Sequence, residues 1–481
     1  AYDISNDSAW LVANINSGSY SNSWPGQFMS VLVGDTIYFD ANDGSTGREL
    51  WAHDTSNHST WRVTNINSSA SSDVGTHMHV LVGDTIYFNA RDGYDSASTG
   101  TELWAHDTSN HSTWRVADIN SGATSSSPGV NMAFLIGDTL YFDASGGGTT
   151  SNRELWAHDT SNHSTWQVAD ISTGGNGNVG LYMSTLVGDT LYFSASDGST
   201  GTELWAHDTS NHSTWQAANI NFGLGSSMPG QHLELLVGDT LYFSANDGSK
   251  GTELWAHDTS NHSTWRVADI NNWVMMGGAG LSSNPGEYMA ISVGDTIYFS
   301  AQDQPSGHEL WAHDTSNHST WQVADIRSGP GSGSFPGQYM EILIGDTLYF
   351  SADDGSTGYE LWAHDTSNRS TWQVDDLRSG PGSSDPGQNL ELLVGDTLYF
   401  AANDGSTGYE LWAHRPLSID YNTNTGGNVT TWAINASLPS GLSFGTNNGT
   451  IYGTPTELWT QTSYMVWANN SGGSSVAYLN I

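Results

Sequence analysis

The chain has 481 residues, and 50 acidic against 11 basic residues give it a net charge of −39. A surface this acidic repels nucleic acids and anionic membranes, and it suits a salty environment or the binding of cations. The sequence has no cysteine, which excludes disulfides, thiolate metal sites and a cysteine nucleophile. Because no apolar run approaches the roughly 20 residues of a transmembrane helix, we expect no membrane insertion.

One stretch, Glu49 to Trp61 (Glu-Leu-Trp-Ala-His-Asp-Thr-Ser-Asn-His-Ser-Thr-Trp), returns almost unchanged along the chain. Its Leu-Trp pair recurs eight times with a period of about 52 residues, which is typical of a radial or linear repeat array. The eight tryptophans are Trp51, Trp104, Trp156, Trp205, Trp255, Trp311, Trp362 and Trp412.

Each repeat contains four short runs rich in β-branched and aromatic residues. In the first repeat these runs are 29–33, 36–40, 49–53 and 60–66. Turn residues separate them, beginning with the two-residue hairpin signal Gly34-Asp35. No segment has sustained helical periodicity. Four antiparallel strands in each of eight repeats predict an all-β, eight-bladed β-propeller.

The two ends of the repeat region complement each other. Residues 2–15 align with residues 53–66, so the chain begins with a fourth strand that lacks its first three. The eighth repeat stops after His414 and has no fourth strand. We therefore expect the N-terminal strand to complete the eighth blade and close the ring. A start at Ala1 inside the pattern predicts a mature form from which any targeting segment has been removed.

The remaining residues, 415–481, follow a different pattern of short strands and Gly/Pro turns, which predicts a small β-sandwich. The predicted domains are thus a propeller at 1–414 and a sandwich at 415–481. In the propeller, the second-to-third turn and the connection between repeats should share one face, here called the first face. The insertions that differ between repeats all fall there: 19–24, 222–228, 273–276 and 327–335. Variation on one face of a rigid scaffold favours a binding surface.

Two families resemble this chain at these motifs. The repeats, with Glu-Leu-Trp-Ala-His-Asp-Thr, are similar to the ELWxxDGT-type repeats of secreted prokaryotic proteins. The string from Leu438 to Thr456 (Leu-Pro-x-Gly-Leu…Gly-Thr-Ile-x-Gly-Thr-Pro-Thr) resembles Ig-like domains of bacterial and archaeal surface proteins. Both resemblances imply an extracellular, non-enzymatic role.

Acidic residues gather at the turn between the second and third strands. Carboxylate and amide oxygens around a glycine turn are the ligands that Ca²⁺ prefers, although an Asp-Gly hairpin needs no metal. Both interpretations stay open. The candidate ligands are Asp40, Asn42, Asp43, Asp92, Asp197, Asp247, Asp354 and Asp404.

The third turn carries an Asn-x-Ser sequon in nearly every repeat. N-glycans would fit exposed hairpin tips in a secreted protein, while the alternative is that Asn supplies the left-handed residue of the turn. The candidate glycosylation sites are Asn6, Asn57, Asn110, Asn162, Asn211, Asn261, Asn317, Asn368, Asn428, Asn435 and Asn448.

The repeated histidines and tryptophans are predicted to be structural, because eight identical copies argue for a scaffold. Trp24 and Trp273 differ, since each lies in a variable loop, and they are the candidates for ligand contact. No nucleophile elbow, phosphate-binding loop or metalloprotease motif is present, so we expect no enzyme activity and no catalytic residue.

These observations predict a non-catalytic structural or adhesive protein of a prokaryotic cell surface or matrix. A detached first strand also suggests filaments, in which the strand completes the eighth blade of a neighbouring copy. The alternative is a calcium-dependent module that binds carbohydrate or protein through the variable face. The expected partners are further copies of the chain or surface glycans, and the expected cofactor, if any, is Ca²⁺.

Overall fold

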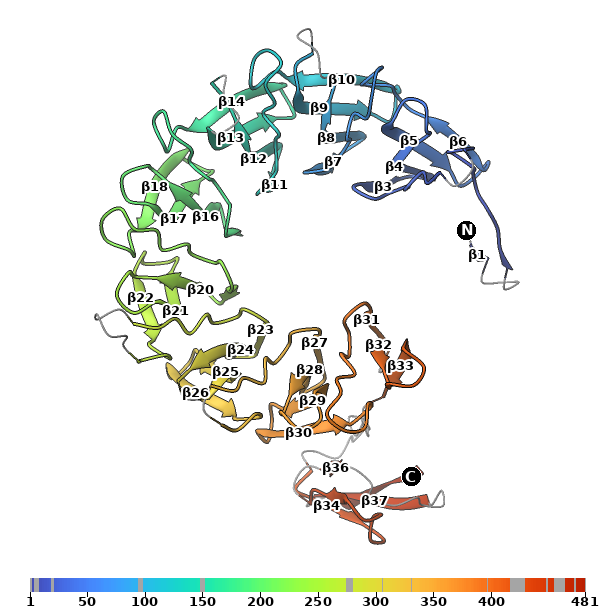
Figure 1. Cartoon of the computed structure of the whole chain (residues 1–481), viewed down its shortest axis with the longest axis vertical. Helices are drawn as coiled ribbons and strands as arrows, with labels where there is room; N and C mark the ends of the chain where they lie inside the picture. The colour runs from blue at the N-terminus through green and yellow to red at the C-terminus, as the bar shows by residue number, and fades with distance from the viewer. Residues whose placement is uncertain are drawn as a thin grey trace. The chain divides into compact units, whose positions relative to one another are not determined.

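In the computed structural model, each repeat folds into its own antiparallel β-sheet (Figure 1). The description covers the chain except residues 1, 4–7, 19–20, 94–97, 148–151, 274–279, 305, 330, 396, 416–428, 447–448, 454–462, 471–472 and 481. The described residues are strands, turns and bends without any helix, as predicted. Seven four-stranded sheets and one of three strands follow one another, which fits a propeller-like fold.

The strands fall into four equivalent sets. The first strands are β3 (Ser30–Val33), β7 (His79–Val82), β11 (Ala133–Ile136), β15 (Ser184–Val187), β19 (Glu234–Val237), β23 (Ala290–Val293), β27 (Glu341–Ile344) and β31 (Glu391–Val394). The second strands are β4 (Thr36–Asn42), β8 (Thr85–Arg91), β12 (Thr139–Ser145), β16 (Thr190–Ser196), β20 (Thr240–Asn246), β24 (Thr296–Asp303), β28 (Thr347–Asp353) and β32 (Thr397–Asn403). The third strands are β5 (Arg48–Asp54), β9 (Thr101–Asp107), β13 (Arg153–Asp159), β17 (Thr202–Asp208), β21 (Thr252–Asp258), β25 (Gly307–Asp314), β29 (Tyr359–Asp365) and β33 (Tyr409–His414). The fourth strands are β6 (Ser59–Arg62), β10 (Ser112–Ala117), β14 (Ser164–Ala169), β18 (Ser213–Ala218), β22 (Thr264–Ala268), β26 (Ser319–Ala324) and β30 (Ser370–Asp375).

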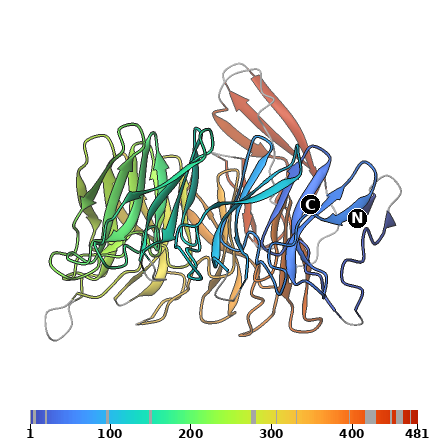
Figure 2. The same cartoon turned by 90° about the horizontal axis from the view of Figure 1, so that it is seen from above.

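Tight turns set the register of each sheet. Val33 lies opposite Thr36, so Gly34-Asp35 is a two-residue hairpin loop, and Gly34 has the positive φ (58°) that such a loop requires. At the same end of the sheet, the amide of Thr55 donates to the carbonyl of Asp35 (2.8 Å). The Gly-Asp turn and the third turn therefore share one face, the second face, and the strands of each sheet run between two sets of loops (Figure 2).

Consecutive sheets pack through apolar side chains of the second and third strands. In the second repeat, Leu103 and Ala105 are fully buried, and they pack in one cluster with Leu140, Phe142 and Ala144 of the third repeat. Burial of one such leucine or phenylalanine contributes roughly 1.5–3 kcal/mol. The core is therefore a series of layers between neighbouring sheets, and each repeat depends on the next for its cover.

The chain divides into two compact units. The first contains residues 1–234, 239–251 and 257–265, and the second contains residues 235–238, 252–256 and 266–481. The first four sheets thus belong to the first unit, and sheets six to eight with the C-terminal module belong to the second. Each unit is described by itself below.

The N-terminal strand does not continue as the sequence predicts. In the first unit, β1 (Tyr2–Asp3) pairs with β2 (Ser8–Ala9), with Tyr2 opposite Ala9. This pairing repeats the register of the third hairpin, where His53 lies opposite Thr60. The stretch after it, residues 10–18, contains no strand. In the second unit, the eighth sheet has three strands, in the order β31–β32–β33.

The C-terminal module is a separate small β-structure. One sheet has the order β34 (Thr431–Ile434), β37 (Ser463–Asn470) and β38 (Gly473–Asn480), and β35 (Leu442–Phe444) pairs with β36 (Ile451–Gly453). Trp432, Val466 and Ala468 form its buried cluster. The predicted short strands between Gly/Pro turns are therefore present.

Candidate functional site

A buried glutamate joins each of the first seven repeats to the loop that follows it. In the seventh repeat, the carboxylate of Glu360 accepts hydrogen bonds from the amide of Leu377 (2.9 Å) and from the amide and hydroxyl of Ser384 (3.1 and 2.7 Å). Burial raises the pKa of Glu360 to about 7, although these hydrogen bonds oppose the shift. We call this arrangement the glutamate contact.

The same contact recurs with little variation. Across the seven repeats, the distance from the glutamate carboxylate to the amide of the following Ile or Leu is 2.7–2.9 Å. The glutamates are Glu49, Glu102, Glu154, Glu203, Glu253, Glu309 and Glu360, and all are at most 1% exposed. Since the glutamate and its bond to the following Ile or Leu amide recur in all seven repeats, we interpret this contact as part of the scaffold.

The loop before the first strand of each of the eight sheets contains a residue in the left-handed region, just before a Pro-Gly or Val-Gly pair. The φ values lie between 45° and 50° at Trp24, Asp73, Ser127, Asn178, Met228, Asn284, Phe335 and Asp385. Such values are unusual for bulky residues such as Trp24 and Phe335. In the sixth repeat, the amides of Ser334 and Phe335 both donate to the carbonyl of His308 (2.8 and 3.2 Å), which holds this conformation. The scaffold thus fixes one variable side chain per repeat on the first face.

The acidic turns are satisfied by their own residues. Asp43 accepts hydrogen bonds from the amides of Ser45 (2.8 Å) and Thr46 (2.7 Å) and from both hydroxyls. Burial alone would raise the pKa of Asp43, but these hydrogen bonds lower it to about 2. Asp92 accepts from Thr99, and Asp197, Asp247, Asp354 and Asp404 accept from the residues two and three positions ahead.

Two of the predicted calcium ligands have other roles. Asp40 is fully buried, where it accepts from the amides of Phe28 and Met29 and pairs with Arg48. Asn42 accepts from the amide of Gly44 (2.8 Å). The residues that the structure describes contain no group of three or more His, Asp or Glu side chains that could hold a metal ion. Calcium binding at these turns stays a prediction, which titration with CaCl₂ would test.

The sequon turns are exposed, but their asparagines are held in place. Asn57 donates through Nδ2 to Asp54 (2.6 Å) and accepts the amide of Ser59 (2.9 Å). Asn57 and its copies at 110, 162, 211, 261, 317 and 368 are exposed, as is Asn435 in the C-terminal module. Asn6, Asn428 and Asn448 lie outside the described residues. Glycosylation of these sites stays a prediction.

The left-handed residue of this turn is not the asparagine, and our alternative interpretation of the turn is therefore wrong. His58 has a φ of 61°, and the equivalent residues, up to Arg369 at 65°, share this conformation. The reason is that Asn57 already uses its side-chain oxygen to accept the amide of Ser59. The next residue therefore adopts the positive φ.

The repeated histidines connect neighbouring sheets. Nδ1 of His364 lies 2.8 Å from the hydroxyl of Thr371, and its ring packs against Tyr298 of the preceding repeat with 5.2 Å between centroids. Burial lowers the pKa of His364 to about 4, so the ring is neutral at pH 7. The pair recurs between Tyr38 and His106 and between Tyr349 and His414. This arrangement fits the structural role that the sequence predicts.

The two candidate tryptophans are both exposed, each with 57% of its surface accessible. Trp24 borders a shallow hollow together with Leu11, Pro25 and residues 13–16 and 21–23. Its backbone carbonyl accepts a hydrogen bond from Arg48 (3.0 Å). Trp273 precedes residues 274–279, which lie outside the described part. The structure does not bring Trp273 together with other candidate residues.

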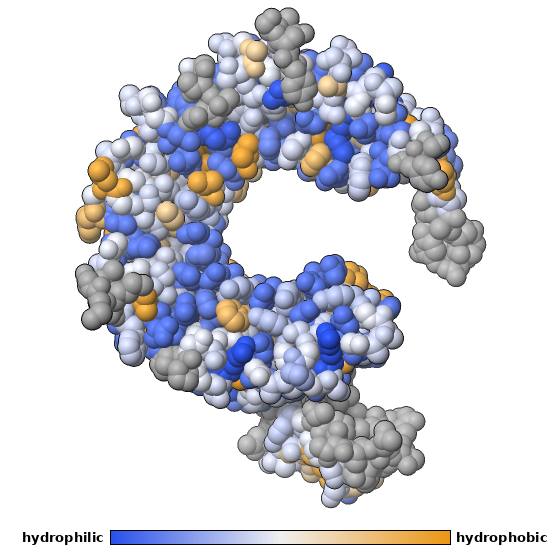
Figure 3. All heavy atoms as spheres, viewed as in Figure 1, coloured by the Kyte–Doolittle hydropathy of each residue, from blue (hydrophilic) through white to orange (hydrophobic). Residues whose placement is uncertain are grey.

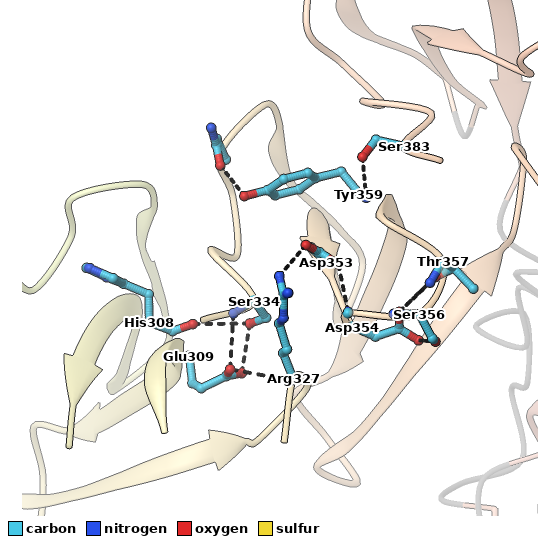
Figure 4. Close-up of polar contacts among 12 residues, drawn as sticks. His308, Glu309, Arg327, Ser334, Asp353, Asp354, Ser356, Thr357, Tyr359 and Ser383 are labelled. Atoms are coloured by element: carbon cyan, nitrogen blue, oxygen red, sulfur yellow. Dashed lines mark hydrogen bonds and ion pairs between the residues drawn. The ribbon is translucent and has the colours of Figure 1, made fainter. Parts of the chain in front are cut away.

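Sequence reasoning missed the most aromatic part of the first face, in repeats six to eight. We call it the aromatic strip: Tyr288, His308, Phe335, Tyr339, Tyr359 and Tyr409. Figure 4 shows part of it, with Tyr359 above the ion pair between Arg327 and Asp353 (2.5 Å). Alignment of the repeats could have revealed this strip, because the residue before the conserved glutamate is aromatic only at His308, Tyr359 and Tyr409.

The eighth repeat leaves apolar surface without cover in its unit. Leu411 is 64% exposed, whereas its seven equivalents are at most 1% exposed. Leu390 and Leu392 are 41% and 52% exposed, and Glu410 is exposed where the other glutamates are buried. These side chains belong to the layer that a following repeat covers elsewhere. In the first unit, Trp10 and Leu11 are 47% and 77% exposed. The rest of the visible surface is mostly hydrophilic (Figure 3).

Comparison with known proteins identifies the C-terminal module. Residues 404–481 match the family described as "Putative Ig domain", which supports the predicted Ig-like domain. No curated protein matches the chain. The described residues also contain no helix with the length and apolar character that crossing a membrane needs.

Solved structures resemble the chain only distantly. A puromycin hydrolase matches 82% of this chain and 61% of its own, at 12% identity and a TM-score of 0.33. A prolyl endopeptidase structure matches 94% of this chain and 55% of its own, at 10% identity and a TM-score of 0.36. An oligogalacturonate lyase in complex with manganese matches 66% and 82%, at 11% identity and a TM-score of 0.31. The chain thus spans about three fifths of the length of the first two proteins.

Proposed function

We propose that this protein is a non-catalytic, extracellular structural or adhesive component that assembles by strand complementation. Residues 1–24 complete the eighth sheet, either of the same chain, which closes an eight-bladed ring, or of a neighbouring copy, which builds a filament. The observation that carries the proposal is the exposed edge of the eighth repeat. There Glu410 and Leu411 stand in the same Glu-Leu-Trp-Ala-His string as in the other repeats, but their side chains are exposed.

The N-terminal segment contains the missing partners of this edge. In the first repeat, Glu49 accepts from the amide of Ile66 and the hydroxyl of Ser72 (both 2.9 Å). The residues that align with these donors are Ile15 and Ser23. Ser23 is partly exposed, whereas Ser72 is fully buried. Docking of the segment on β33 would give Glu410 the donors that Glu49 has in the first repeat.

The register of docking follows from the other repeats. Ala52 pairs with Trp61 and Trp51 pairs with Arg62. By alignment, Trp10 would lie opposite Ala413, and Leu11 opposite Trp412. In the same register Ala9 would lie opposite His414, so docking would replace the pairing of Ala9 with Tyr2 in the hairpin β1–β2. Docking would cover the exposed ring of Trp10, and it would bring a first repeat to the place from which a following repeat covers Leu361 elsewhere, so that Leu411 is buried as well. The loss of exposed apolar surface favours association through the hydrophobic effect.

Linkage within one chain favours ring closure, because the effective concentration of a tethered strand is high. Donation to a neighbour preserves the same contacts and gives an open, head-to-tail polymer. A surface-associated Ig-like module and exposed sequon turns support a place outside the cell. The alternative function, calcium-dependent binding of carbohydrate or protein, would use the variable first face.

The test exploits the absence of native cysteines. We expect the pair Ala9→Cys and His414→Cys, placed opposite each other as Thr60 and His53 are, to form a disulfide under mild oxidation. A faster-migrating monomer on a non-reducing gel indicates a closed ring, and a ladder of multimers indicates a filament. Each single-cysteine variant is the control. Free thiols in the double variant would contradict complementation. So would electron micrographs in which the protein still forms single closed rings after deletion of residues 1–24.

A further inference from the structure

The aromatic strip spans three repeats and contains two groups of contacting rings, with Tyr409 bonded to Asp385 beyond them. Tyr288 packs edge-to-face against His308 (5.2 Å between centroids) and Phe335 (5.4 Å), and His308 stacks on Phe335 (5.3 Å). Tyr339 packs edge-to-face against Tyr359 (5.1 Å). Phe335 occupies the left-handed loop position, so the backbone fixes its direction. Most of these rings are partly exposed, and the strip therefore presents aromatic surface to solvent in a fixed arrangement.

The scaffold does not require these rings. The residue before the conserved glutamate is Thr101, Thr202 and Thr252 in three other repeats, which have the same sheet and the same glutamate contact. The position of Tyr288 and Tyr339 is likewise filled by Asn131 and Asn389 elsewhere. Three consecutive repeats thus carry large rings where threonine suffices for folding, which favours a role outside the fold.

Hydrogen-bonding groups fix and border the rings. The hydroxyl of Tyr359 donates to Oε1 of Gln338, and the hydroxyl of Tyr409 donates to Oδ2 of Asp385 (2.7 Å). The bond to Asp385 raises the pKa of Tyr409 to about 12. The amide group of Gln338 and the second oxygen of Asp385 remain at the edge of the strip as a donor and an acceptor.

The charges around the strip select the class of ligand. The nearby Arg327 is paired with Asp353, and Arg378 donates to the carbonyl of Ser383 (3.2 Å). Together with the net charge of −39, this arrangement disfavours phosphate, sulfate and uronic acid groups. Tyr288, His308 and Phe335 contact one another directly, with 5.2–5.4 Å between centroids, so no space is left between them for the cage that a quaternary ammonium group needs. A neutral sugar chain fits, because its C–H faces pack on rings and its hydroxyls bond to carboxylate and amide groups.

We propose that the aromatic strip binds neutral polysaccharide chains. This proposal rests on the adhesive role proposed above and adds the class of ligand. Binding by the strip does not depend on whether residues 1–24 close a ring or link copies. The partly exposed rings of Phe335 and the tyrosines provide several stacking positions for one extended chain. His308 is only 8% exposed and holds Tyr288 and Phe335 in place. Gln338 and Asp385 direct the sugar hydroxyls.

Affinity electrophoresis of the full-length protein tests this proposal. The probes are gels that contain a β-1,4-glucan, a mannan or a galactan, compared with gels that contain a polyuronate. We expect retardation by at least one neutral polysaccharide and none by the polyuronate. The double variant His308→Thr and Tyr359→Thr should weaken the retardation at least tenfold, and it should keep the fold because threonine occupies these positions in three repeats.

The matched control is Tyr182→Asn, which removes a tyrosine from the equivalent position in a repeat outside the strip. It should leave the retardation unchanged. The proposal is overturned if no neutral polysaccharide retards the protein, if the double variant is retarded like the wild type, or if choline or a proline-rich peptide binds the strip in its place. Strand complementation is judged separately, since loss of the disulfide between residues 9 and 414 would not affect retardation.

Discussion

Two parts of the molecule with nearly the same sequence have opposite environments. Leu361 in the seventh repeat is 1% exposed, and Leu411 in the eighth is 64% exposed, although both stand in the string Tyr-Glu-Leu-Trp-Ala-His. Glu360 and Glu410 differ in the same way. The comparison teaches that the following repeat, and not the strand itself, determines the burial of these side chains. A repeat without a successor exposes a complete docking surface.

The largest expected effect is on the free energy of unfolding when either of these two leucines is replaced by alanine. Leu361→Ala should destabilise the protein by about 2–5 kcal/mol, because it leaves a cavity between two sheets. If strand complementation places a first repeat over Leu411, Leu411→Ala should cost a similar amount in the full chain, and under about 0.5 kcal/mol in a chain that lacks residues 1–24. Urea unfolding followed by tryptophan fluorescence measures both. An equally small cost of Leu411→Ala in the two chains would contradict docking.

The glutamate contact gives the second effect. Glu360→Gln keeps one acceptor oxygen but places an amide group against N–H donors, so we expect a loss of about 1–3 kcal/mol at pH 5. The carboxyl of an unfolded chain ionises near 4.5, and burial raises the pKa of the folded Glu360 to about 7. Since the folded state binds the proton more tightly, wild-type stability should fall relative to the variant as the pH rises from 4.5 to 7.

This fall is at most about 1.4 kcal/mol per pH unit, and it should level off above pH 7. Unfolding midpoints of the two proteins at pH 5, 6, 7 and 8 provide the measurement. The control is Glu410→Gln in the chain without residues 1–24, where the exposed carboxylate has no buried donors, and we expect a change under about 0.5 kcal/mol. A constant difference between wild type and Glu360→Gln across this range would show that burial does not govern the group.

Local patterns predicted the sheets well. The β-branched runs and the Gly-Asp turns have the expected strands and hairpins, because they depend on neighbours within a few residues. The glutamate contact escaped prediction, since the donors to Glu360 come from residues 17 and 24 positions further along. The left-handed loop position escaped for a related reason: Phe335 is held by a carbonyl of the previous repeat. Periodicity reveals which residues recur, but contacts between repeats determine what they do.

The smallest effect on stability concerns the sequon turns. Ser319→Ala removes the sequon of Asn317 but keeps the two hydrogen bonds of the asparagine, to Asp314 (2.6 Å) and from the amide of residue 319 (3.0 Å). We therefore expect a change in stability under about 0.5 kcal/mol. In protein from its native host, intact mass should fall by the mass of one glycan. The contrasting variant, Asn317→Ala, should lose the glycan and also weaken the turn, because it removes the Nδ2 donor to Asp314 and the acceptor of the amide of Ser319. Equal masses of wild type and Ser319→Ala would mean that this asparagine serves the turn alone.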